Sequence, residues 1–250
     1  MNLAKVRLDK LIFTLGLVDS RNIAQSLIIR GLVLVDNEPV TKPGSLVSPE
    51  CKVRIKNHGQ KYVSRAGEKL EHALDFFNVQ VKDLVCLDVG SSTGGFTDCL
   101  LTKEASFVYA VDVGTNQLAY KLRQNNQVKV FEKTHANELN PEMFSKKIEL
   151  AVIDVSFIAV RKILKHITEV ISDHSKIIVL VKPQFELEKK YISSGGVVKS
   201  EKDQLLAVKL VTDFAESNNL ENLGVVKSPI LGAKKGNQEY LVLLSKKLKL

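Results

Sequence analysis

The hydrophobic positions at the start of the chain predict two short amphipathic helices. From Val6 to Leu17, apolar residues fall at helical spacing, while charged residues occupy the other faces. The same spacing returns between Ile23 and Ile28 and ends before Gly31, a residue type that commonly follows the last turn of a helix. Asp19 and Ser20 precede this second segment and offer an N-cap. We therefore expect the chain to open with a helix pair.

Short strands and a polar connector follow the helix pair. The segment 32–40 begins with an apolar run and residues 52–55 alternate polar and apolar positions, so both are strand candidates, with turn-forming Asp, Asn, Pro and Gly residues nearby. This periodicity disappears in the sequence NHGQKYVSRAG, residues 57–67, which predicts a linker. We therefore expect a small α+β domain at residues 1–60 and a second domain at residues 61–250.

The second part of the chain alternates strand and helix patterns. Helical spacing covers residues 68–77, and further helical segments are expected at residues 97–102 and 160–171. The apolar runs that we interpret as strands are Val85–Val89, Phe107–Val111, Lys129–Phe131, Leu150–Ile153, Ile177–Val181, Gly224–Lys227 and Tyr240–Leu244. This alternation predicts an α/β fold with a doubly wound, mostly parallel, Rossmann-like sheet of seven strands. Such sheets bind ligands at the carboxyl ends of their strands.

Composition favours a soluble globular protein that stays in the cytoplasm. The chain has 250 residues, of which 44% are hydrophobic and 26% are charged. Its apolar runs are far shorter than the roughly 20 residues of a membrane-spanning helix, and the first residues lack the apolar core of a signal peptide. Cys51, Cys86 and Cys99 form an odd set without CxxC spacing, which favours neither a disulfide framework nor a zinc site. We expect no membrane span, no export and no metal.

The charge of the chain is unevenly distributed. The net charge is +8, and residues 1–60 contribute 9 Lys and Arg against 5 Asp and Glu, which gives +4. A polyanionic partner such as a nucleic acid would explain this basicity. The alternative is that moderate basicity only keeps the protein soluble. Charge alone leaves both interpretations open.

A glycine-rich turn follows the first strand of the predicted sheet. In LDVGSSTGGF, residues 87–96, Asp88 ends the strand and a helix begins near Phe96. The spacing matches neither the G-x-G-x-x-G dinucleotide fingerprint nor a phosphate-binding P-loop, because no lysine follows Gly95. Glycines let the main chain approach a ligand closely. A carboxylate just before a turn that contains no basic side chain suits a cationic or zwitterionic ligand, such as the amino-acid head of S-adenosylmethionine. The candidate cofactor-binding residues here are Asp88, Gly90, Ser91, Ser92, Thr93, Gly94, Gly95 and Phe96.

Further candidates for the cofactor follow the next strands. Asp112 ends the second strand, where an acidic side chain can accept hydrogen bonds from a ribose diol, and Val113 lies beside it. Asn137, in the segment THAN after the third strand, is a candidate for the adenine side, and Asp154 ends the fourth strand. The alternative for each lone aspartate is a helix cap or a turn former.

The N-terminal pattern resembles a known RNA-binding module. The run RLDKLIFTLGLVDSRNIAQSLIIRGLVLVDNEPVTKPGSLV is similar to an S4 domain, and the similarity spans residues 5 to 56. In such domains the helix pair presents basic residues to structured RNA, and guanidinium groups pair well with phosphates. The resemblance implies Arg7, Lys10, Arg21 and Arg30 as RNA-binding residues, and we add Arg65 from the connector. The alternative for each of them is a solvated helix face.

The whole chain resembles the TlyA family, S4-containing relatives of FtsJ-type RNA ribose methyltransferases that were once labelled haemolysins. The resemblance rests on YVSRAGEKL, CLDVGSSTGGFTDCLL, YAVDVGTNQLAYKLR, VIDVSFI, LVKPQFE and GGVV. It implies a methyltransferase that uses S-adenosylmethionine to methylate the 2′-oxygen of a cytidine in 16S or 23S ribosomal RNA within ribosomal subunits. It also implies a catalytic set of Lys69, Asp154, Lys182 and Glu239. We make no prediction of the oligomeric state.

The chemistry of ribose methylation asks for these residue types. A 2′-hydroxyl is a poor nucleophile and must lose its proton during attack, so a base is needed within hydrogen-bond reach. A desolvated lysine beside another cation loses its proton more readily, so Lys182 next to Lys69 would serve as this base. Asp154 would orient Lys182, and Glu239 would hold Lys69 or the hydroxyl. Without the resemblance, Lys69 would be taken for a surface lysine of an amphipathic helix.

The sequence argues against several rival functions. A cytosine-C5 methyltransferase needs a nucleophilic cysteine, whereas Cys86 and Cys99 lie in apolar segments typical of a core. An amino methyltransferase typically has a D/N-P-P-Y loop, whereas residues 154–157 here read DVSF. An RNA-binding or ribosome assembly factor without catalysis is a further alternative, and cofactor binding would discriminate it. A membrane-active haemolysin is the last rival function, and the sequence offers no bilayer-spanning segment to support it.

Overall fold

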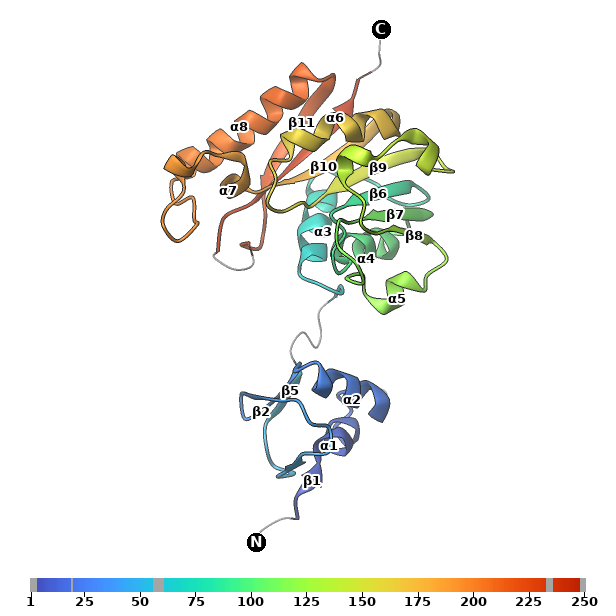
Figure 1. Ribbon diagram of the computed structural model, residues 1–250, viewed down its shortest axis with the longest axis vertical. Coiled ribbons are helices and arrows are strands. Elements are labelled where there is room, and N and C mark those ends of the chain that lie inside the picture. Colours follow the sequence, from blue (N-terminus) through green and yellow to red (C-terminus); the bar gives the residue numbers. More distant parts are fainter. Residues whose placement is uncertain (1–3, 19, 56–60, 233–235, 248–250) are drawn as a thin grey trace. The chain divides into compact units, whose positions relative to one another are not determined.

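The protein divides into two compact units, residues 1–60 and residues 61–250. The computed structural model describes residues 4–18, 20–55, 61–232 and 236–247 (Figure 1). Each unit has its own hydrophobic core.

The N-terminal unit consists of two helices and two small sheets. The helices are α1 (Leu8–Thr14) and α2 (Arg21–Ile29), and the strands are β1 (Val6–Arg7), β2 (Val33–Val35), β3 (Glu38–Val40), β4 (Leu46–Val47) and β5 (Val53–Ile55). Strands β3, β2 and β5 form an antiparallel sheet in that order, and β1 pairs with β4. The core joins both helices to β2 and β5 through Leu8, Ile12, Ala24, Ile28, Val33 and Ile55.

The helix pair is confirmed, with a correction at its start. Val6 does not belong to the first helix, because it pairs with Val47 in a short antiparallel ladder, and the helix begins only at Leu8. Helical spacing could not reveal this ladder, since its partner strand lies some 40 positions later in the chain. The side chain of Ser20 caps α2 by accepting a hydrogen bond from the N–H of Ile23. Asp19, the other expected cap, lies outside the described residues.

The C-terminal unit is the predicted α/β fold with a mostly parallel, seven-stranded sheet. Its strands are β6 (Val85–Val89), β7 (Phe107–Val111), β8 (Val128–Phe131), β9 (Ile148–Ile153), β10 (Ile171–Val181), β11 (Leu220–Lys227) and β12 (Tyr240–Lys246). They lie in the order β11-β12-β10-β9-β6-β7-β8. Only β12 runs against its neighbours within this sheet, antiparallel to both β10 and β11. Strands β10 and β11 begin earlier than the apolar pattern predicted.

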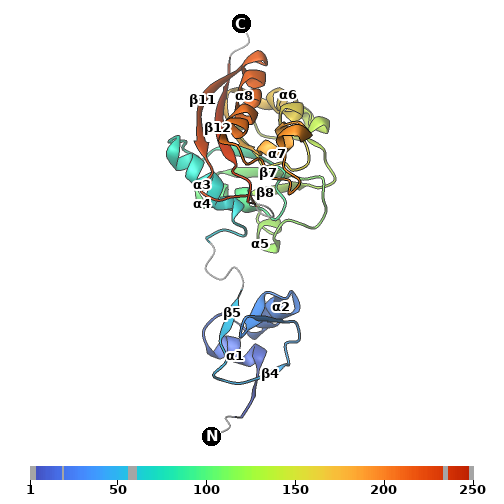
Figure 2. The ribbon, with the colours of Figure 1, turned by 90° about the vertical axis from the view of Figure 1, so that its left-hand side faces the viewer.

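Helices cover both faces of this sheet. They are α3 (Ala66–Phe76), α4 (Gly95–Thr102), α5 (Tyr120–Arg123), α6 (Arg161–Val170), α7 (Pro183–Glu186) and α8 (Glu201–Ser217), with short 3-10 turns η1 (Ala136–Glu138), η2 (Pro141–Met143) and η3 (Lys189–Tyr191). Figure 2 shows α3 and α4 on one side of the sheet and α6 and α8 on the other. No helix among the described residues is long and apolar enough to cross a bilayer.

Strand residues alternate between two cores, one on each face. In β10, for example, Ile177, Val179 and Val181 pack toward α6 and α8, whereas Ile178 and Leu180 pack toward α3 and α4. Successive side chains of a strand point to opposite faces, so a sheet covered on both sides requires an unbroken apolar run. Each fully buried aliphatic side chain contributes about 1.5–3 kcal/mol, so this sandwich is the main source of the unit's stability.

The antiparallel strand β12 brings distant parts of the chain to one edge. Because β6, β7, β9 and β10 are parallel, their carboxyl ends lie on the same edge of the sheet. Val181 at the end of β10 pairs with Tyr240 at the start of β12. The residue that follows β10 and the residue that precedes β12 are therefore neighbours at this edge.

Candidate active site

The four residues predicted for catalysis come together in one cavity. Lys69 lies on α3, Asp154 follows β9, Lys182 follows β10 and Glu239 precedes β12, and all four line a cavity of about 730 Å³. Three of them sit at the carboxyl edge of the sheet for the topological reason given above. Helix α3 adds the fourth residue from the face of the sheet that it covers.

Lys182 is held by an oxygen on either side. Its Nζ lies 2.6 Å from Oδ1 of Asp154 and donates a hydrogen bond of 2.8 Å to Oγ of Ser156. The two charged side chains are only 11% and 18% exposed. The expected contact between Asp154 and Lys182 is present.

Lys69 and Glu239 form the second ion pair of the cavity. Nζ of Lys69 donates to Oε2 of Glu239 at 2.5 Å, and the side chains are 10% and 4% exposed. Glu239 is also packed tightly from behind, because a Cβ placed on Gly232 would lie 2.6 Å from its Oε1. Lys69 is thus not the surface lysine that helical spacing alone suggests. Each lysine of the cavity is therefore paired with a carboxylate, whereas the sequence interpretation pairs the two lysines with each other.

Aromatic and polar residues that the sequence did not single out complete the lining. Phe157 is 91% exposed and has a backbone φ of +66°, a conformation that non-glycine residues rarely adopt. Its ring centroid lies 5.3 Å from that of Phe185. Gln184 also lines the cavity, and its buried Oε1 has no hydrogen-bond partner among the described residues. The signal available for Ser156, Phe157 and Gln184 was their position directly after Asp154 or Lys182.

The glycines of the turn after β6 are required by close packing within the protein. Gly90 and Gly94 have positive φ values of +85° and +94°. A Cβ on Gly90 would lie 2.4 Å from the carbonyl oxygen of Asp154, and one on Gly94 would lie 2.3 Å from Leu122. A Cβ on Gly95 would lie 2.2 Å from Oγ of Ser64. Packing within the protein is thus enough to require glycine at these three positions, and the role in ligand approach that the sequence suggests stays a prediction.

Asp88 is buried beneath this turn. It is fully inaccessible to solvent, and its Oδ2 accepts a hydrogen bond of 2.6 Å from Oγ1 of Thr97. Its other oxygen, Oδ1, has no partner among the described residues. Burial raises the pKa of Asp88 to about 7, and the negative charges of Asp154 and Asp112 act in the same direction. Asp88 therefore lies in the interior under the turn and is not part of its exposed surface.

Asp112 organises the turn from the neighbouring strand. Its Oδ2 accepts the N–H of Ser92 and its Oδ1 accepts the N–H of Gly114, each at 2.7 Å. The N–H groups of Gly90 and Ser91 bond to the carbonyl of Val111, which fastens the turn to β7. Asp112 is half-buried, and each oxygen keeps a lone pair for a further donor.

The remaining predicted cofactor residues differ in accessibility. Thr93 and Val113 are exposed near the turn, whereas Phe96 is 2% exposed and packs in the core under α3 and α4. Asn137 is exposed in η1, in the segment whose Thr134 N–H bonds to the carbonyl of Asp112. None of these four residues lines the cavity of the ion pairs. Asp154 does line it, and it is the one residue predicted both for catalysis and for cofactor binding.

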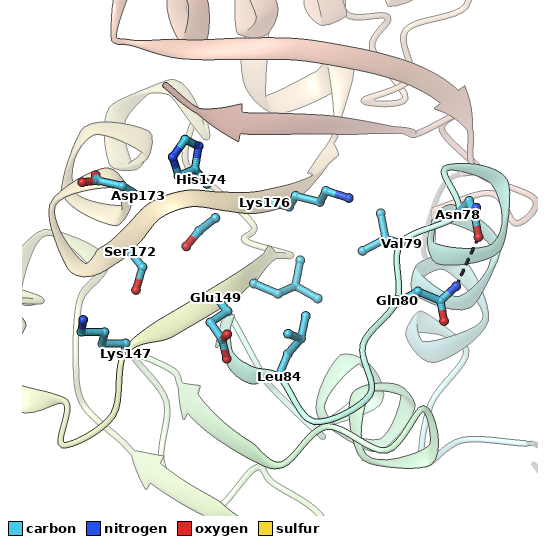
Figure 3. A pocket seen from close by; sticks show the side chains of 12 residues that line it. Asn78, Val79, Gln80, Leu84, Lys147, Glu149, Ser172, Asp173, His174 and Lys176 are labelled. Carbon is cyan, nitrogen blue, oxygen red and sulfur yellow. Dashed lines mark hydrogen bonds between the residues drawn. The ribbon is translucent and has the colours of Figure 1, made fainter. Parts of the chain in front are cut away.

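A second cavity lies at the opposite edge of the sheet. It measures about 510 Å³ and opens near the start of β9 and the first half of β10 (Figure 3). The ionisable residues among its lining are Lys147, Glu149, Asp173, His174 and Lys176. It contains no residue of the predicted site, so the cavity of the two ion pairs is the candidate active site. Elsewhere in the described chain, no three His, Cys, Asp or Glu side chains gather as a metal site would require.

The predicted RNA-binding residues are placed in both units. Arg7 and Arg21 meet at the carboxylate of Asp9 in the N-terminal unit. Lys10 and Arg30 are exposed on and just after the helices. Arg65 lies in the C-terminal unit, where it lines the active-site cavity.

The fold and the two parts of the site define a class of protein, the Rossmann-like methyltransferases. Residues 62–246 match the FtsJ-like methyltransferase family, and residues 6–51 match the S4 domain. Hemolysin A of Brachyspira hyodysenteriae is 41% identical over 94% of this chain and 98% of its own length. A 16S/23S rRNA (cytidine-2'-O)-methyltransferase TlyA of Mycobacterium tuberculosis is 38% identical over 96% of this chain and 90% of its own length.

A solved structure is similar to this chain over nearly its whole length. A protein described as a putative hemolysin from Streptococcus thermophilus superposes with a TM-score of 0.74 at 38% identity. The match covers 98% of this chain and 89% of the other. The chain belongs to the TlyA family of FtsJ-like methyltransferases that carry an S4 domain.

Proposed function

We propose that this protein transfers a methyl group from S-adenosylmethionine to a ribose 2′-hydroxyl of ribosomal RNA. The observation that carries the proposal is the meeting of Lys69, Asp154, Lys182 and Glu239 in one cavity as two buried ion pairs. Residues 61–250 would form the catalytic domain and residues 1–60 an RNA-binding domain. The Mycobacterium tuberculosis relative, a 16S/23S rRNA (cytidine-2'-O)-methyltransferase by name, supports a cytidine of 16S or 23S rRNA as the target. Ribosomal subunits as the substrate would place the reaction in the cytoplasm.

The turn after β6 suits S-adenosylmethionine. Residues 87–96 contain no lysine or arginine, and two carboxylates, Asp88 and Asp112, lie beneath and beside the turn. The unpartnered Oδ1 of Asp88 adds negative potential there, which favours a ligand with a cationic amino group. The free lone pairs of Asp112 suit a ribose diol. When bound, the cofactor supplies a methyl carbon attached to a positively charged sulfur.

The ion-pair cavity suits proton removal from a hydroxyl. Nζ of Lys182, in its deprotonated form, would accept the proton of the 2′-hydroxyl while the oxygen forms its bond to the methyl carbon. The bond from that carbon to sulfur would break, and its electron pair would remain on the sulfur. Asp154 and Ser156 hold Nζ in place, so little motion is needed at the moment of reaction. Lys69, fixed by Glu239, would stabilise the negative charge that develops on the ribose oxygen.

The aromatic residues at the cavity suit a nucleotide that has left its helix. Phe157 exposes nearly all of its ring, and Phe185 lies beside it. Bases removed from a stack commonly rest on aromatic faces, and enzymes that modify nucleotides within helices extrude them in this way. Arg65 lines the same cavity and would neutralise an adjacent phosphate.

The structure argues against a rival reaction at a base carbon. Such a reaction needs a reactive cysteine, but Cys86 and Cys99 are fully buried in the core under α3 and α4. Burial raises the pKa of both thiols, to about 12 for Cys99, so neither supplies a thiolate at neutral pH.

The decisive experiment supplies labelled S-adenosylmethionine and ribosomal subunits that lack the modification. The wild-type protein should place the label on a ribose 2′-oxygen, and Lys182→Ala should abolish transfer while RNA binding remains. Label on a base, or full activity of the variant, would refute the proposal. A protein that binds the subunits but never the cofactor would instead be an assembly factor.

A further inference from the structure

We propose that Asp9 is a positioning residue that presents the guanidinium groups of Arg7 and Arg21 to RNA phosphates. The inference deepens the proposed function and rests on it, because it assumes that the N-terminal unit binds RNA through these arginines. Asp9 itself was not among the predicted RNA-binding residues, and as an acidic group it would be expected to repel RNA.

The carboxylate of Asp9 is the centre of a hydrogen-bond network. Arg7 contacts it in forked geometry, with Nε 3.1 Å from Oδ1 and Nη2 3.0 Å from Oδ2. Nη2 of Arg21 and Nε2 of Gln25 donate to Oδ2 at 3.0 Å and 2.9 Å, and the N–H of Lys10 donates to Oδ1 at 2.8 Å. These five bonds saturate the acceptor capacity of a carboxylate.

The network joins three elements of the unit. Arg7 ends β1, Asp9 lies in the first turn of α1, and Arg21 and Gln25 lie one helical turn apart on α2. Asp9 is fully buried, whereas the side chains of Arg7 and Arg21 are 51% and 48% exposed. The carboxylate is thus hidden from RNA, and the two cations that it holds are accessible.

This arrangement orders flexible side chains before RNA arrives. A guanidinium has five N–H donors, and the bonds to Asp9 use two of Arg7 and one of Arg21. The remaining donors of each fork can contact phosphate oxygens. Because each arginine is already fixed, less conformational entropy is lost on binding. Arg7 also packs on the loop before β4, where a Cβ on Gly44 would lie 3.4 Å from its Nη1.

Asp9 stays ionised under all physiological conditions. The hydrogen bond from Arg7 is the largest influence and holds the pKa of Asp9 well below its usual range, against the opposing effect of burial. The cluster of one carboxylate and two guanidinium groups therefore keeps a net positive charge.

Charge and positioning predict opposite effects for Asp9→Asn. This substitution removes a negative charge from the N-terminal unit, so charge alone predicts tighter RNA binding and a steeper dependence on salt. Loss of positioning predicts weaker binding and a shallower dependence. Asp36→Asn is a matched control, because Asp36 lies in the same unit and is exposed, and its carboxylate accepts a hydrogen bond only from the N–H of Lys52 among the described residues. Its φ of +49° is well tolerated by asparagine.

The experiment measures the affinity of the full chain for ribosomal subunits that lack the methylation, at several salt concentrations. Asp9→Asn should weaken binding about tenfold and reduce the slope of log affinity against log salt by about one. Asp36→Asn should bind as well as the wild type or slightly better. Gln25→Ala, which leaves the charge unchanged, should weaken binding roughly threefold.

A double-mutant cycle separates positioning from loss of the fold. Asp9→Asn should not weaken binding further in a chain that already carries Arg7→Ala and Arg21→Ala, because no arginine is left to position. If Asp9→Asn unfolded the unit, binding would weaken further because Lys10 and Arg30 would also be displaced, and the proposal would be overturned. It would equally be overturned if Asp9→Asn matched Asp36→Asn while the double arginine variant bound poorly. Wild-type affinity of the double arginine variant would refute the RNA-binding role of these arginines itself.

Discussion

Nζ of Lys69 and Oε2 of Glu239 lie 2.5 Å apart in the interior of the catalytic unit, although 170 positions separate the two residues in the chain. Both side chains are almost fully buried, so each charge depends on the other for compensation. Lys69→Met or Glu239→Gln leaves one buried charge without its partner. Each single variant should lose about 3–5 kcal/mol of unfolding free energy in urea denaturation.

The double variant Lys69→Met/Glu239→Gln should be more stable than either single variant, because no isolated charge remains. Its methyltransferase activity should be lost, since both charged groups of this pair in the proposed site are gone. Additive losses of stability in the double variant would show that the two charges do not compensate each other.

Asp154→Asn should impair the transfer step and leave RNA binding intact. Asparagine has the size of aspartate but lacks the charge that attracts Nζ of Lys182 across 2.6 Å. A misplaced proton acceptor reduces the rate by about 10²–10⁴-fold, so single-turnover methylation should slow by at least about a hundredfold. Asp173→Asn removes an ion pair with Lys246 far from the site and should have no effect. An equal loss in both variants would contradict the assignment.

Gly90→Ala should disturb both the glycine-rich turn after β6 and the cavity of the two ion pairs. A Cβ on Gly90 would lie 2.4 Å from the carbonyl oxygen of Asp154, and the residue has a φ of +85°. The added methyl must displace the backbone after β9, at a cost of about 2–4 kcal/mol. Thermal unfolding and methylation assays should both show a loss. Gly195→Ala is the control, because its Cβ would meet only Oγ of Ser193 at 3.8 Å.

Asp88→Asn should stabilise the protein above neutral pH. Burial raises the pKa of Asp88 to about 7, whereas an unfolded chain has a value near 3.9. Between these values the folded state binds a proton that the unfolded state lacks, so stability falls as pH rises from about 4 to 7. Asparagine removes this loss, which is on the order of 2–4 kcal/mol at pH 8.

Thermal unfolding of wild type and Asp88→Asn between pH 5 and pH 8 tests this expectation. The advantage of the variant should shrink steadily as the pH falls. Its affinity for S-adenosylmethionine, measured by calorimetry, should decrease because the negative potential beneath the turn is lost. A stability difference that is the same at every pH would rule out the titration of Asp88 as the cause.

Phe157→Gly should reduce RNA affinity without harming the fold. Phe157 is 91% exposed with a φ of +66°, a conformation that glycine adopts without strain. Unfolding free energy should therefore rise by up to about 1 kcal/mol. The KM for RNA should rise about tenfold, since stacking of one base contributes about 1–3 kcal/mol. Tyr120→Ala, at an exposed aromatic residue outside the cavity, should change neither quantity.

The sequence predicts the sheet well because its strands are buried on both faces. A short unbroken apolar run such as Ile177–Val181, rich in β-branched residues, is typical of a strand covered on both sides, and the order of strands and helices then restricts the topology. The ladder of β1 with β4 escaped prediction because each strand has only two residues and no periodicity of its own. The antiparallel direction of β12 also could not be predicted, because the sequence within the strand does not indicate in which direction it pairs.

The candidate site was predicted unevenly for a similar reason. The burial of Lys69 depends on Glu239, whose position is fixed by the last strand of the sheet and not by neighbouring sequence. The network of Asp9 depends in the same way on Arg21 and Gln25 from a second helix. The resemblance to a family supplied the four catalytic positions, whereas Ser156, Phe157 and Gln184 emerged only from the assembled cavity.

The antiparallel strand β12 has a consequence for newly made chains. Because it places Glu239 beside the end of β10, Lys69 gains its counter-charge only after residues 240–246 have been synthesised and inserted between β10 and β11. A nascent chain that has made everything up to α8 still lacks this partner. The ion pair of the candidate site is therefore complete only after strand β12 has been synthesised and has joined the sheet.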